Sequence, residues 1–393
     1  MTDNAKSPIL SKNVSSSIGL EPPLRFPGFE GEWLPTTIGE ICDFQNGKAH
    51  EKDVDEFGKF IIVNSKFISS DGTITKYSNK QICPLYKNDI VMVMSDVPKG
   101  KAIAKCLLID KDNKYTLNQR ICSLRAKETP FFYLLQINRN DYFLKFDDGV
   151  KQTNLRKEDI LSCPIYKTML QEQQKIADFL SLVDERIEKQ RQLVEVLKRY
   201  KRGLLFDIFN RKIQLGNNSA WRSVMLSDCC AGFDNMRKPI SSELREKGTV
   251  PYYGANGVQD YVKDYIFDGN YVLLAEDGGR FDEFYSMPIA QFITGKSWVN
   301  NHAHVLQALR GFDTKFIYYA LVHKDIRKYI NGSSRAKLNQ EDMWQIKIYT
   351  PCFDDQKKIA SFMTVVDNMI NQHEFRLAKL TDLKNAFLQQ MFI

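Results

Sequence analysis

Two short polar stretches contain side chains that could form base-specific hydrogen bonds. They lie at 118–120 and 300–304, and their polar members are Asn118, Gln119, Arg120, Asn300, Asn301, His302 and His304. Asparagine and glutamine can hold adenine through two hydrogen bonds, and arginine can hold guanine in the same way. The chemistry that these residue types indicate is recognition of base edges in DNA.

Other residues in expected loops extend this candidate set. Lysine would neutralise phosphates, whereas amide, histidine, arginine and tyrosine side chains could contact bases. The additional candidates are Lys48, His50, Asn64, Lys66, Lys76, Asn235, Arg237, Lys238, Tyr252, Tyr253 and Asn256. Each is weak evidence alone, because an exposed Asn or Lys more often forms a turn or carries a solvated charge.

Motifs for catalysis are incomplete or absent. The stretch TGKSW at 294–298 contains Gly-Lys-Ser, but Ala290 stands where a phosphate-binding loop requires glycine. The nucleophile-elbow, zinc-protease and dinucleotide patterns do not occur, nor does the Asn/Asp-Pro-Pro-aromatic motif of adenine methyltransferases. Asp96 and Asp277 recur at equivalent places, which is typical of a turn at the end of a strand. We expect no catalytic residue in this chain.

A metal site is also not expected. His302 and His304 alternate along an expected strand and would face one side, but the sequence offers no further Cys or Asp beside them. The eight cysteines show no zinc-binding spacing. Most lie in apolar runs, so they are expected to be buried, reduced thiols, which indicates a cytoplasmic protein.

The sequence contains a long internal repeat. QEQQKIADFLSLVDERI begins at 171 and DDQKKIASFMTVVDNMI begins at 354, 183 residues later. The same offset aligns the chain without a gap from Gly149 and Gly332 to the end. Before this region the match is looser, but NQRICSLRA (118–126) still resembles NNHAHVLQA (300–308). The polar stretches at 118–120 and 300–304 therefore stand at equivalent places with different residues, as two readers of different sequences would.

Each copy of the repeat ends in a heptad pattern. Apolar residues step by alternating four and three, which is typical of a coiled-coil helix. The predicted seam consists of Ile176, Leu180, Val183, Ile187, Val194, Leu197, Leu204 and Ile208, then Ile359, Met363, Val366, Ile370, Leu377, Leu380, Phe387 and Met391. Polar residues interrupt it at Gln190 and His373 and at Lys201 and Lys384. Antiparallel pairing of the two helices is the simplest arrangement, and the alternative is a long core helix within one domain.

The fold class that follows is α+β, with two α+β domains separated by two long antiparallel coiled-coil helices in a pseudo-twofold repeat. Short apolar strands alternate with Gly, Asn and Asp turns in both globular parts, and 131–137 and 315–322 are predicted helices. The predicted boundaries are a loose tail at 1–20, a first domain at 21–160, a central helix at 161–212, a second domain at 213–345 and a C-terminal helix at 346–393. No apolar segment approaches the ~20 residues that a bilayer requires.

This organisation resembles the specificity subunit of type I restriction–modification enzymes. PPLRFPGFEGEW (22–33), PYYGANG (251–257), WVNNHAHVL (298–306) and GSSRAKLNQEDM (332–343) are similar to recurring phrases of that family. The helical repeats around Asp184 and Asp367 resemble its central and C-terminal conserved regions. The second helical segment ends near Ile393. Any contact that joins this end of the helices to the first domain and closes a ring would have to come from residues near the N-terminus, such as 22–33.

The resemblance implies a non-catalytic, DNA-reading subunit. Each target-recognition domain would read one half of an asymmetric bipartite site in double-stranded DNA, and the coiled coil would set the spacing. Expected partners are two methyltransferase subunits and the restriction subunits. S-adenosylmethionine, ATP and Mg would be held by those partners, with no cofactor in this chain. The net charge of +7 permits DNA binding without requiring it. The alternatives are a stand-alone methyltransferase or nuclease with an unrecognised site, and a non-catalytic protein adaptor.

Overall fold

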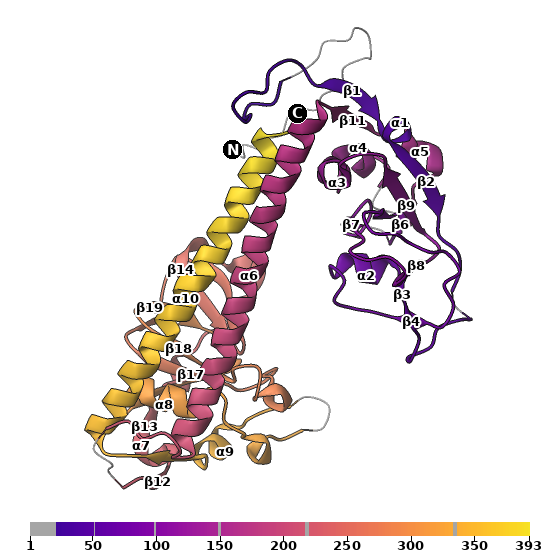
Figure 1. The fold of residues 1–393 in the computed structure, drawn as a ribbon. Coiled ribbons are helices and arrows are strands. Elements are labelled where there is room, and N and C mark those ends of the chain that lie inside the picture. The colour runs from indigo at the N-terminus through magenta and orange to yellow at the C-terminus, as the bar shows by residue number, and fades with distance from the viewer. Residues whose placement is uncertain (1–20, 51, 98–99, 148–150, 217–219, 333–335) are drawn as a thin grey trace. The chain divides into compact units, whose positions relative to one another are not determined.

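The computed structural model describes residues 21–50, 52–97, 100–147, 151–216, 220–332 and 336–393. The chain divides into two compact units (Figure 1). Unit 1 comprises the described residues of Met1–Glu188 together with Lys379–Ile393, and unit 2 comprises Lys189–Ala378. Each unit thus contains one mixed domain and a segment of both long helices. The expected loose tail at 1–20 lies outside the described residues.

Unit 1 contains short strands and helices that lead into the first long helix. Its strands are β1 (Leu34–Thr37), β2 (Cys42–Asn46), β3 (Phe60–Val63), β4 (Tyr77–Ser78), β5 (Ile90–Val93), β6 (Ser95–Asp96), β7 (Cys106–Leu108), β8 (Tyr115–Leu117), β9 (Ile121–Ala126), β10 (Thr153–Asn154) and β11 (Pro164–Lys167). Its helices are α1 (Ile38–Ile41), α2 (Ser65–Ser69), α3 (Pro130–Ile137), α4 (Asp141–Leu144) and α5 (Lys157–Leu161), and α6 (Leu170–Phe209) begins here.

Unit 2 repeats the same kinds of element. Its strands are β12 (Arg222–Met225), β13 (Cys230–Gly232), β14 (Lys247–Gly254), β15 (Gly257–Val262), β16 (Phe267–Asp268), β17 (Tyr271–Ala275), β18 (Ala290–Ile293), β19 (Lys296–Val299), β20 (Ala303–Ala308) and β21 (Lys347–Thr350). Its helices are α7 (Leu226–Cys229), α8 (Thr314–Leu321), α9 (Gln340–Trp344) and α10 (Phe353–Gln390), with 3₁₀ turns η1 (Asp234–Met236), η2 (Ser242–Leu244), η3 (Phe281–Glu283) and η4 (Arg327–Tyr329).

The sheets of the two units have matching topology. A four-stranded sheet runs β2-β9-β5-β7 in unit 1 and β13-β20-β17-β18 in unit 2. Each unit has a second sheet, three-stranded with the order β4-β3-β8 in unit 1 and four-stranded with the order β15-β14-β19-β16 in unit 2. The predicted helices at 131–137 and 315–322 are confirmed as α3 and α8. The predicted α+β class and internal repeat are therefore confirmed.

The long helices pair antiparallel within each unit. In unit 1 the rings of Phe179 and Phe387 lie 5.0 Å apart, and Lys384 lies 2.5 Å from Asp184. In unit 2 Gln190 donates to the His373 carbonyl at 2.9 Å, and Lys201 lies 2.5 Å from Asp367. All the predicted seam residues are buried or partly buried. Leu204, Ile208, Ile359 and Met363 also join the domain core of unit 2, so the coiled-coil and core-helix interpretations both apply.

The polar interruptions of the seam have partners on the opposite helix. Lys201 bonds Asp367 of α10, and the equivalent Lys384 bonds Asp184 of α6. Asp367 also accepts a hydrogen bond from Tyr319 of α8 at 2.6 Å. A shift of one helix along the other would separate these charges in a partly buried setting, so the pairs favour a single register.

Reversal of charge at Lys201 is expected to destabilise unit 2 by about 2 kcal/mol. Lys201→Glu would place two carboxylates together at side chains that are only 15% and 24% exposed. Urea denaturation measures the loss, and the second change Asp367→Lys should recover part of it. The exposed control Lys328→Glu should have little effect. If Lys201→Glu and the control Lys328→Glu lost equal stability, a specific role for the pair of Lys201 with Asp367 would be contradicted.

The residues before β1 pack against both long helices of unit 1. Arg25 donates to the Glu172 carboxylate at 2.6 and 2.8 Å, and Trp33 Nε1 donates to it at 3.2 Å. The Leu24 amide donates to the Gln390 carbonyl at 2.8 Å, and the Phe26 ring lies 5.5 Å from that of Phe179. The segment 21–33 thus contacts both the start of α6 and the end of α10. This agrees with the expectation that residues near the N-terminus join the end of the second long helix.

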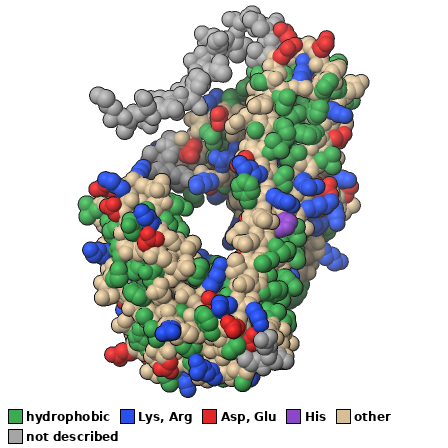
Figure 2. Space-filling model, turned by 90° about the vertical axis from the view of Figure 1, so that its left-hand side faces the viewer, with side chains coloured by type: hydrophobic (Ala, Val, Ile, Leu, Met, Phe, Trp, Pro, Cys, Tyr) green, Lys and Arg blue, Asp and Glu red, His purple; other side chains and the backbone are tan. Residues whose placement is uncertain are grey.

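The outer surface of the long helices is partly apolar. In unit 2, Val365, Met369 and Phe375 of α10 are 59%, 45% and 64% exposed. Hydrophobic side chains lie among lysines and arginines along the long helices (Figure 2). Among the described residues, no helix combines the length and apolar character needed to cross a membrane.

Candidate nucleic-acid interface

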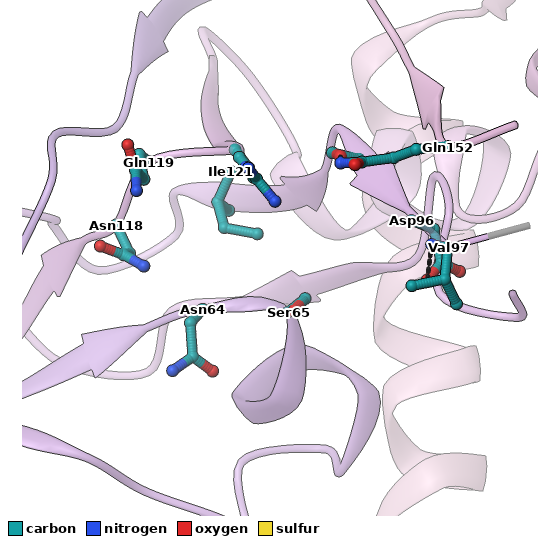
Figure 3. A pocket seen from close by; sticks show the side chains of 10 residues that line it. Asn64, Ser65, Asp96, Val97, Asn118, Gln119, Ile121 and Gln152 are labelled. Atoms are coloured by element: carbon teal, nitrogen blue, oxygen red, sulfur yellow. Dashed lines mark hydrogen bonds between the residues drawn. The ribbon is translucent and has the colours of Figure 1, made fainter. Parts of the chain in front are cut away.

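A polar hollow of about 440 Å³ opens at the edge of the unit 1 sheet (Figure 3). It brings together four of the residues predicted from sequence, Asn64, Asn118, Gln119 and Arg120. They come from the end of β3 and from the turn between β8 and β9. Because β3 pairs in parallel with β8, the carboxyl ends of these strands meet at one edge. This register explains why residues more than fifty positions apart share one site.

Four further polar residues, none of which was predicted as a site residue, line the hollow. These are Ser65, Ser95, Asp96 and Gln152. Gln152 donates to the Ser95 hydroxyl at 2.6 Å, and β6 pairs with β10. Gln152 does not stand out in the sequence as a ligand. The only available signal was its position just before a strand, and nothing local indicated which strand would pair with it.

Two features define the polarity of this hollow. Asp96 accepts hydrogen bonds from the amides of Val97, Ala102 and Ile103 at 2.8, 2.6 and 3.1 Å, so its carboxylate closes a turn as predicted. Asn118 Oδ1 is buried and has no hydrogen-bond partner among the described residues. A buried amide oxygen without a donor is costly, and a donor group of a ligand could satisfy it after a side-chain rotation.

The equivalent edge of unit 2 carries different chemistry. His302 Nδ1 bonds the Asp277 carboxylate, and the His302 amide donates to Asn300 Oδ1 at 2.8 Å. The His302 side chain is 37% exposed. Lys337 reaches Glu276 at 3.2 Å and remains 47% exposed. Unit 2 therefore presents an imidazole and an ammonium where unit 1 presents amides and a guanidinium.

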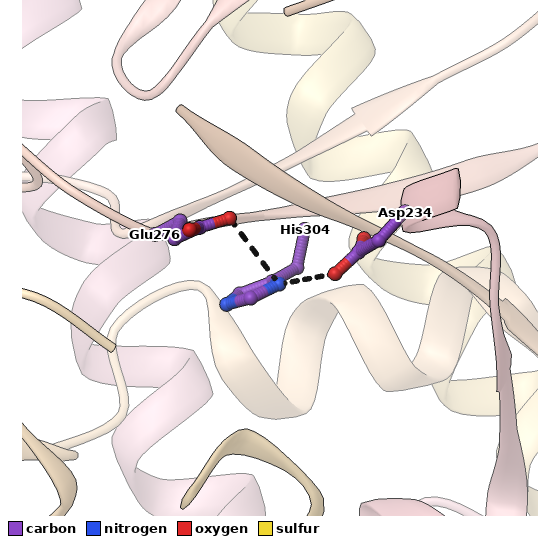
Figure 4. A group of neighbouring side chains, drawn as sticks. All are labelled: Asp234, Glu276 and His304. Atoms are coloured by element: carbon purple, nitrogen blue, oxygen red, sulfur yellow. Dashed lines mark hydrogen bonds and ion pairs between the residues drawn. The ribbon is translucent and has the colours of Figure 1, made fainter. Parts of the chain in front are cut away.

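Next to His302 lies a cluster of the buried His304 with the partly buried Asp234 and Glu276 (Figure 4). His304 Nδ1 lies 2.6 Å from Asp234 and 3.7 Å from Glu276, and its Nε2 lies 2.9 Å from the Leu338 carbonyl. The sequence analysis expected no carboxylate beside the two histidines, and this expectation was wrong. Asp277 contacts His302 and Asp234 contacts His304, although both aspartates come from other segments of the chain. The donor types would suit a metal ion.

Cations of the chain already balance this cluster. Arg237 lies 2.6 Å from Glu276 and 3.4 Å from Asp234, and Lys337 bonds Glu276. Burial would raise the pKa of Asp234, but the hydrogen bond from His304 and the nearby charges lower it below its ordinary value. Two carboxylates with two cations and a histidine form a self-contained network. We therefore assign the cluster a structural role and keep the prediction of no metal site.

Several predicted DNA contacts are instead internal, which corrects the candidate set. Buried or largely buried side chains whose polar atoms already have partners cannot reach base edges in this conformation. His50 bonds Thr116 at 2.8 Å, and Tyr252 accepts from the Ile240 amide at 3.0 Å. The residues withdrawn on these grounds are His50, Arg237, Tyr252, Asn300 and His304.

The remaining candidates lie at the surface or near it. Those that the structure leaves exposed are Lys48, Lys66, Lys76, Gln119, Arg120, Asn235, Lys238, Asn256 and Asn301. Asn64, Asn118, Tyr253 and His302 are partly buried. Asn64 also caps α2 by accepting from the Phe67 amide at 2.9 Å, so its amide oxygen has a structural use. The exposed set stays a prediction of DNA contacts.

Comparison with known proteins places this architecture in one family. The model for the type I restriction modification DNA specificity domain matches residues 30–199 and 218–382, which together span most of the chain. A putative type I restriction enzyme specificity subunit from Haemophilus influenzae is 35% identical over 164 residues, 42% of this chain and 41% of that protein. A putative type I specificity subunit from Mycoplasma genitalium is 23% identical over 92% of this chain and 94% of its own length.

Solved structures show the same fold. The crystal structure of a type I restriction–modification S subunit from M. genitalium has a TM-score of 0.63 at 20% identity, covering 95% of this chain and 99% of that one. A chain from a study of complex assembly and conformational transition of the type I restriction–modification system has a TM-score of 0.52 at 15% identity, covering 94% and 99%. With its two matched domains and paired helices, this chain belongs to the type I restriction–modification DNA specificity family.

Proposed function

We propose that this chain is the sequence-reading subunit of a type I restriction–modification complex and that it catalyses no reaction itself. Unit 1 reads one half of a bipartite DNA target and unit 2 reads the other. The observation that carries this proposal is the pair of equivalent sheet edges with unlike polar residues. Arg120 lines the edge of unit 1, and His302 with Asp277 forms that of unit 2. Different chemistry at equivalent edges suits an asymmetric target.

Partner subunits supply the reaction in this proposal. Two methyltransferase subunits hold S-adenosylmethionine, and restriction subunits use ATP and Mg to cut DNA in the cytoplasm. The exposed apolar residues of the long helices support such docking, because monomeric proteins rarely leave large apolar surfaces uncovered. Leu182, Val365 and Met369 are among these residues. The family membership supports the same partnership.

The test is a genome-wide map of N6-methyladenine in cells with and without the gene, together with assays of purified proteins. We expect methylation at one bipartite site that disappears when the gene is deleted. The purified chain should bind DNA but should methylate only after a methyltransferase partner is added. Methylation or cleavage by the chain alone would instead support the enzyme alternative. DNA protection that survives alanine substitution across 118–120 and 301–302 would support the adaptor alternative.

A further inference from the structure

Arg120 and His302 occupy one structural position in the two units. β5 pairs with β9 so that Val93 lies opposite Ile121, and β17 pairs with β20 so that Ala275 lies opposite Ala303. Arg120 and His302 are the residues just before Ile121 and Ala303. Each therefore stands immediately before an inner strand of its sheet, β9 in unit 1 and β20 in unit 2. The sheet order around them, β2-β9-β5-β7 and β13-β20-β17-β18, is also equivalent.

The guanidinium of Arg120 is available to a ligand. Its backbone adopts a left-handed φ of 66°, and its carbonyl accepts from the Met94 amide at 3.0 Å. The side chain is exposed and forms none of the ion pairs or hydrogen bonds found among the described residues. The nearby Asp96 carboxylate accepts from three backbone amides. An exposed guanidinium at the rim of a polar hollow offers a bidentate pair of donors.

His302 has the opposite hydrogen-bonding character. A carboxylate only accepts hydrogen bonds, so the bond between Asp277 and His302 Nδ1 requires a proton on Nδ1. In a neutral imidazole the other ring nitrogen, Nε2, is then an acceptor. The 37% exposure of the His302 side chain leaves part of the ring accessible to solvent. Asp277 thereby fixes both the orientation and the tautomer of this imidazole.

We infer that Arg120 and His302 are the equivalent specificity-determining residues of the two units, with opposite preferences. Arg120 donates to the O6 and N7 acceptors of guanine in the half-site of unit 1. His302 Nε2 accepts from the exocyclic amino group of adenine or cytosine in the half-site of unit 2. These pairings follow from the donor and acceptor pattern of the major groove. The inference rests on the proposed function and makes Asp277 a positioning residue.

The experiment uses the complete enzyme and maps N6-methyladenine by long-read sequencing for each variant. Arg120→Gln is expected to reduce discrimination at one guanine of the unit 1 half-site by about ten- to a hundredfold. Arg120→Lys keeps the charge but loses the bidentate geometry, so it should relax the same position. The half-site of unit 2 should stay unchanged in both variants. Lys111→Gln, at an exposed lysine of unit 1, is the matched control.

The variants of unit 2 test the tautomer. Asp277→Asn can donate to Nδ1 and so favours a proton on Nε2, which converts Nε2 from acceptor to donor. We expect lower preference for an amino-bearing base at one position of the unit 2 half-site. His302→Gln should also alter that position, with the unit 1 half-site intact. Thermal melting of each purified variant checks that the fold is retained.

The possible outcomes separate this inference from the proposed function. If the wild-type enzyme methylates no bipartite site, the proposed function is wrong. If the wild type does so and the variants lower methylation equally at all sites with an unchanged motif, the side chains contact phosphates and the inference is overturned. An unchanged motif with unchanged methylation overturns it as well. A change in both half-sites from one substitution would contradict the assignment of one residue to each half.

Discussion

Replacement of Glu172 by alanine is expected to destabilise unit 1 by about 3–5 kcal/mol, because it leaves a largely buried arginine without its nearest carboxylate. The Glu172 side chain is 0% exposed and that of Arg25 is 13% exposed. Trp33 and Thr168 also donate to this carboxylate. The loss should first release residues 21–33 from the long helices, and hydrogen exchange of this segment measures that release directly.

The effect of this substitution should depend on pH. Burial would raise the pKa of Glu172, but hydrogen bonds from Arg25 and Thr168 and the charge of Arg25 lower it below its ordinary value. A carboxylate whose pKa is lowered by folding stabilises the protein above its unfolded pKa, and this contribution is lost as the pH falls through the folded value. The difference in the free energy of unfolding between the wild type and Glu172→Ala should therefore be largest at neutral pH and should shrink below about pH 4.

The exposed Glu158 provides a control in the same unit. Glu158→Ala should change the free energy of unfolding by no more than about 0.5 kcal/mol and should leave exchange at 21–33 unaltered. Unchanged exchange of this segment in Glu172→Ala would contradict the role assigned to the ion pair. If the variant Glu172→Gln is as stable as the wild type, hydrogen bonding and not charge holds the segment 21–33.

Insertion of one heptad into each long helix, beside Gln190 and His373, is expected to lengthen the unread spacer of the DNA target by about three base pairs. Seven helical residues add roughly 10.5 Å, and each base pair occupies roughly 3.4 Å. A whole heptad keeps the seam facing its partner, so both half-sites should stay the same. Mapping methylated sites in cells that carry the extended chain measures the spacer. This expectation rests on the proposed function.

Two controls accompany the insertion. A heptad added to α6 alone would break the pairing of Lys201 with Asp367 and should lower stability. Two residues added to both helices would rotate the seam by about 200°, away from its partner, and should abolish methylation. A spacer that stays constant after the double heptad insertion would refute the idea that the helices set the spacing.

Exchange of unit 1 for that of a relative should alter one half-site alone.

Local patterns allowed much of the architecture to be predicted. Heptad spacing and the repeat depend on residues a few positions apart, so the long helices, their seam and the helices at 131–137 and 315–322 could be read directly. The stretch 118–120 was found because polar residues recur at one place in both copies. The structure then grouped it with Asn64 at one hollow. Gln152, which lines the same hollow, gave no such signal.

The sequence alone determined the α+β class, the duplication and the family, because periodicity and repetition are properties of the chain itself. Only the tertiary structure decided which polar residues are accessible. His304 is buried against Asp234, seventy residues away, whereas Arg120 stays at the rim of the hollow. Arg25 and Glu172 meet across 147 residues to hold the ends of two helices. Burial and charge pairing arise from contacts between distant segments, and no local pattern records which segments will meet.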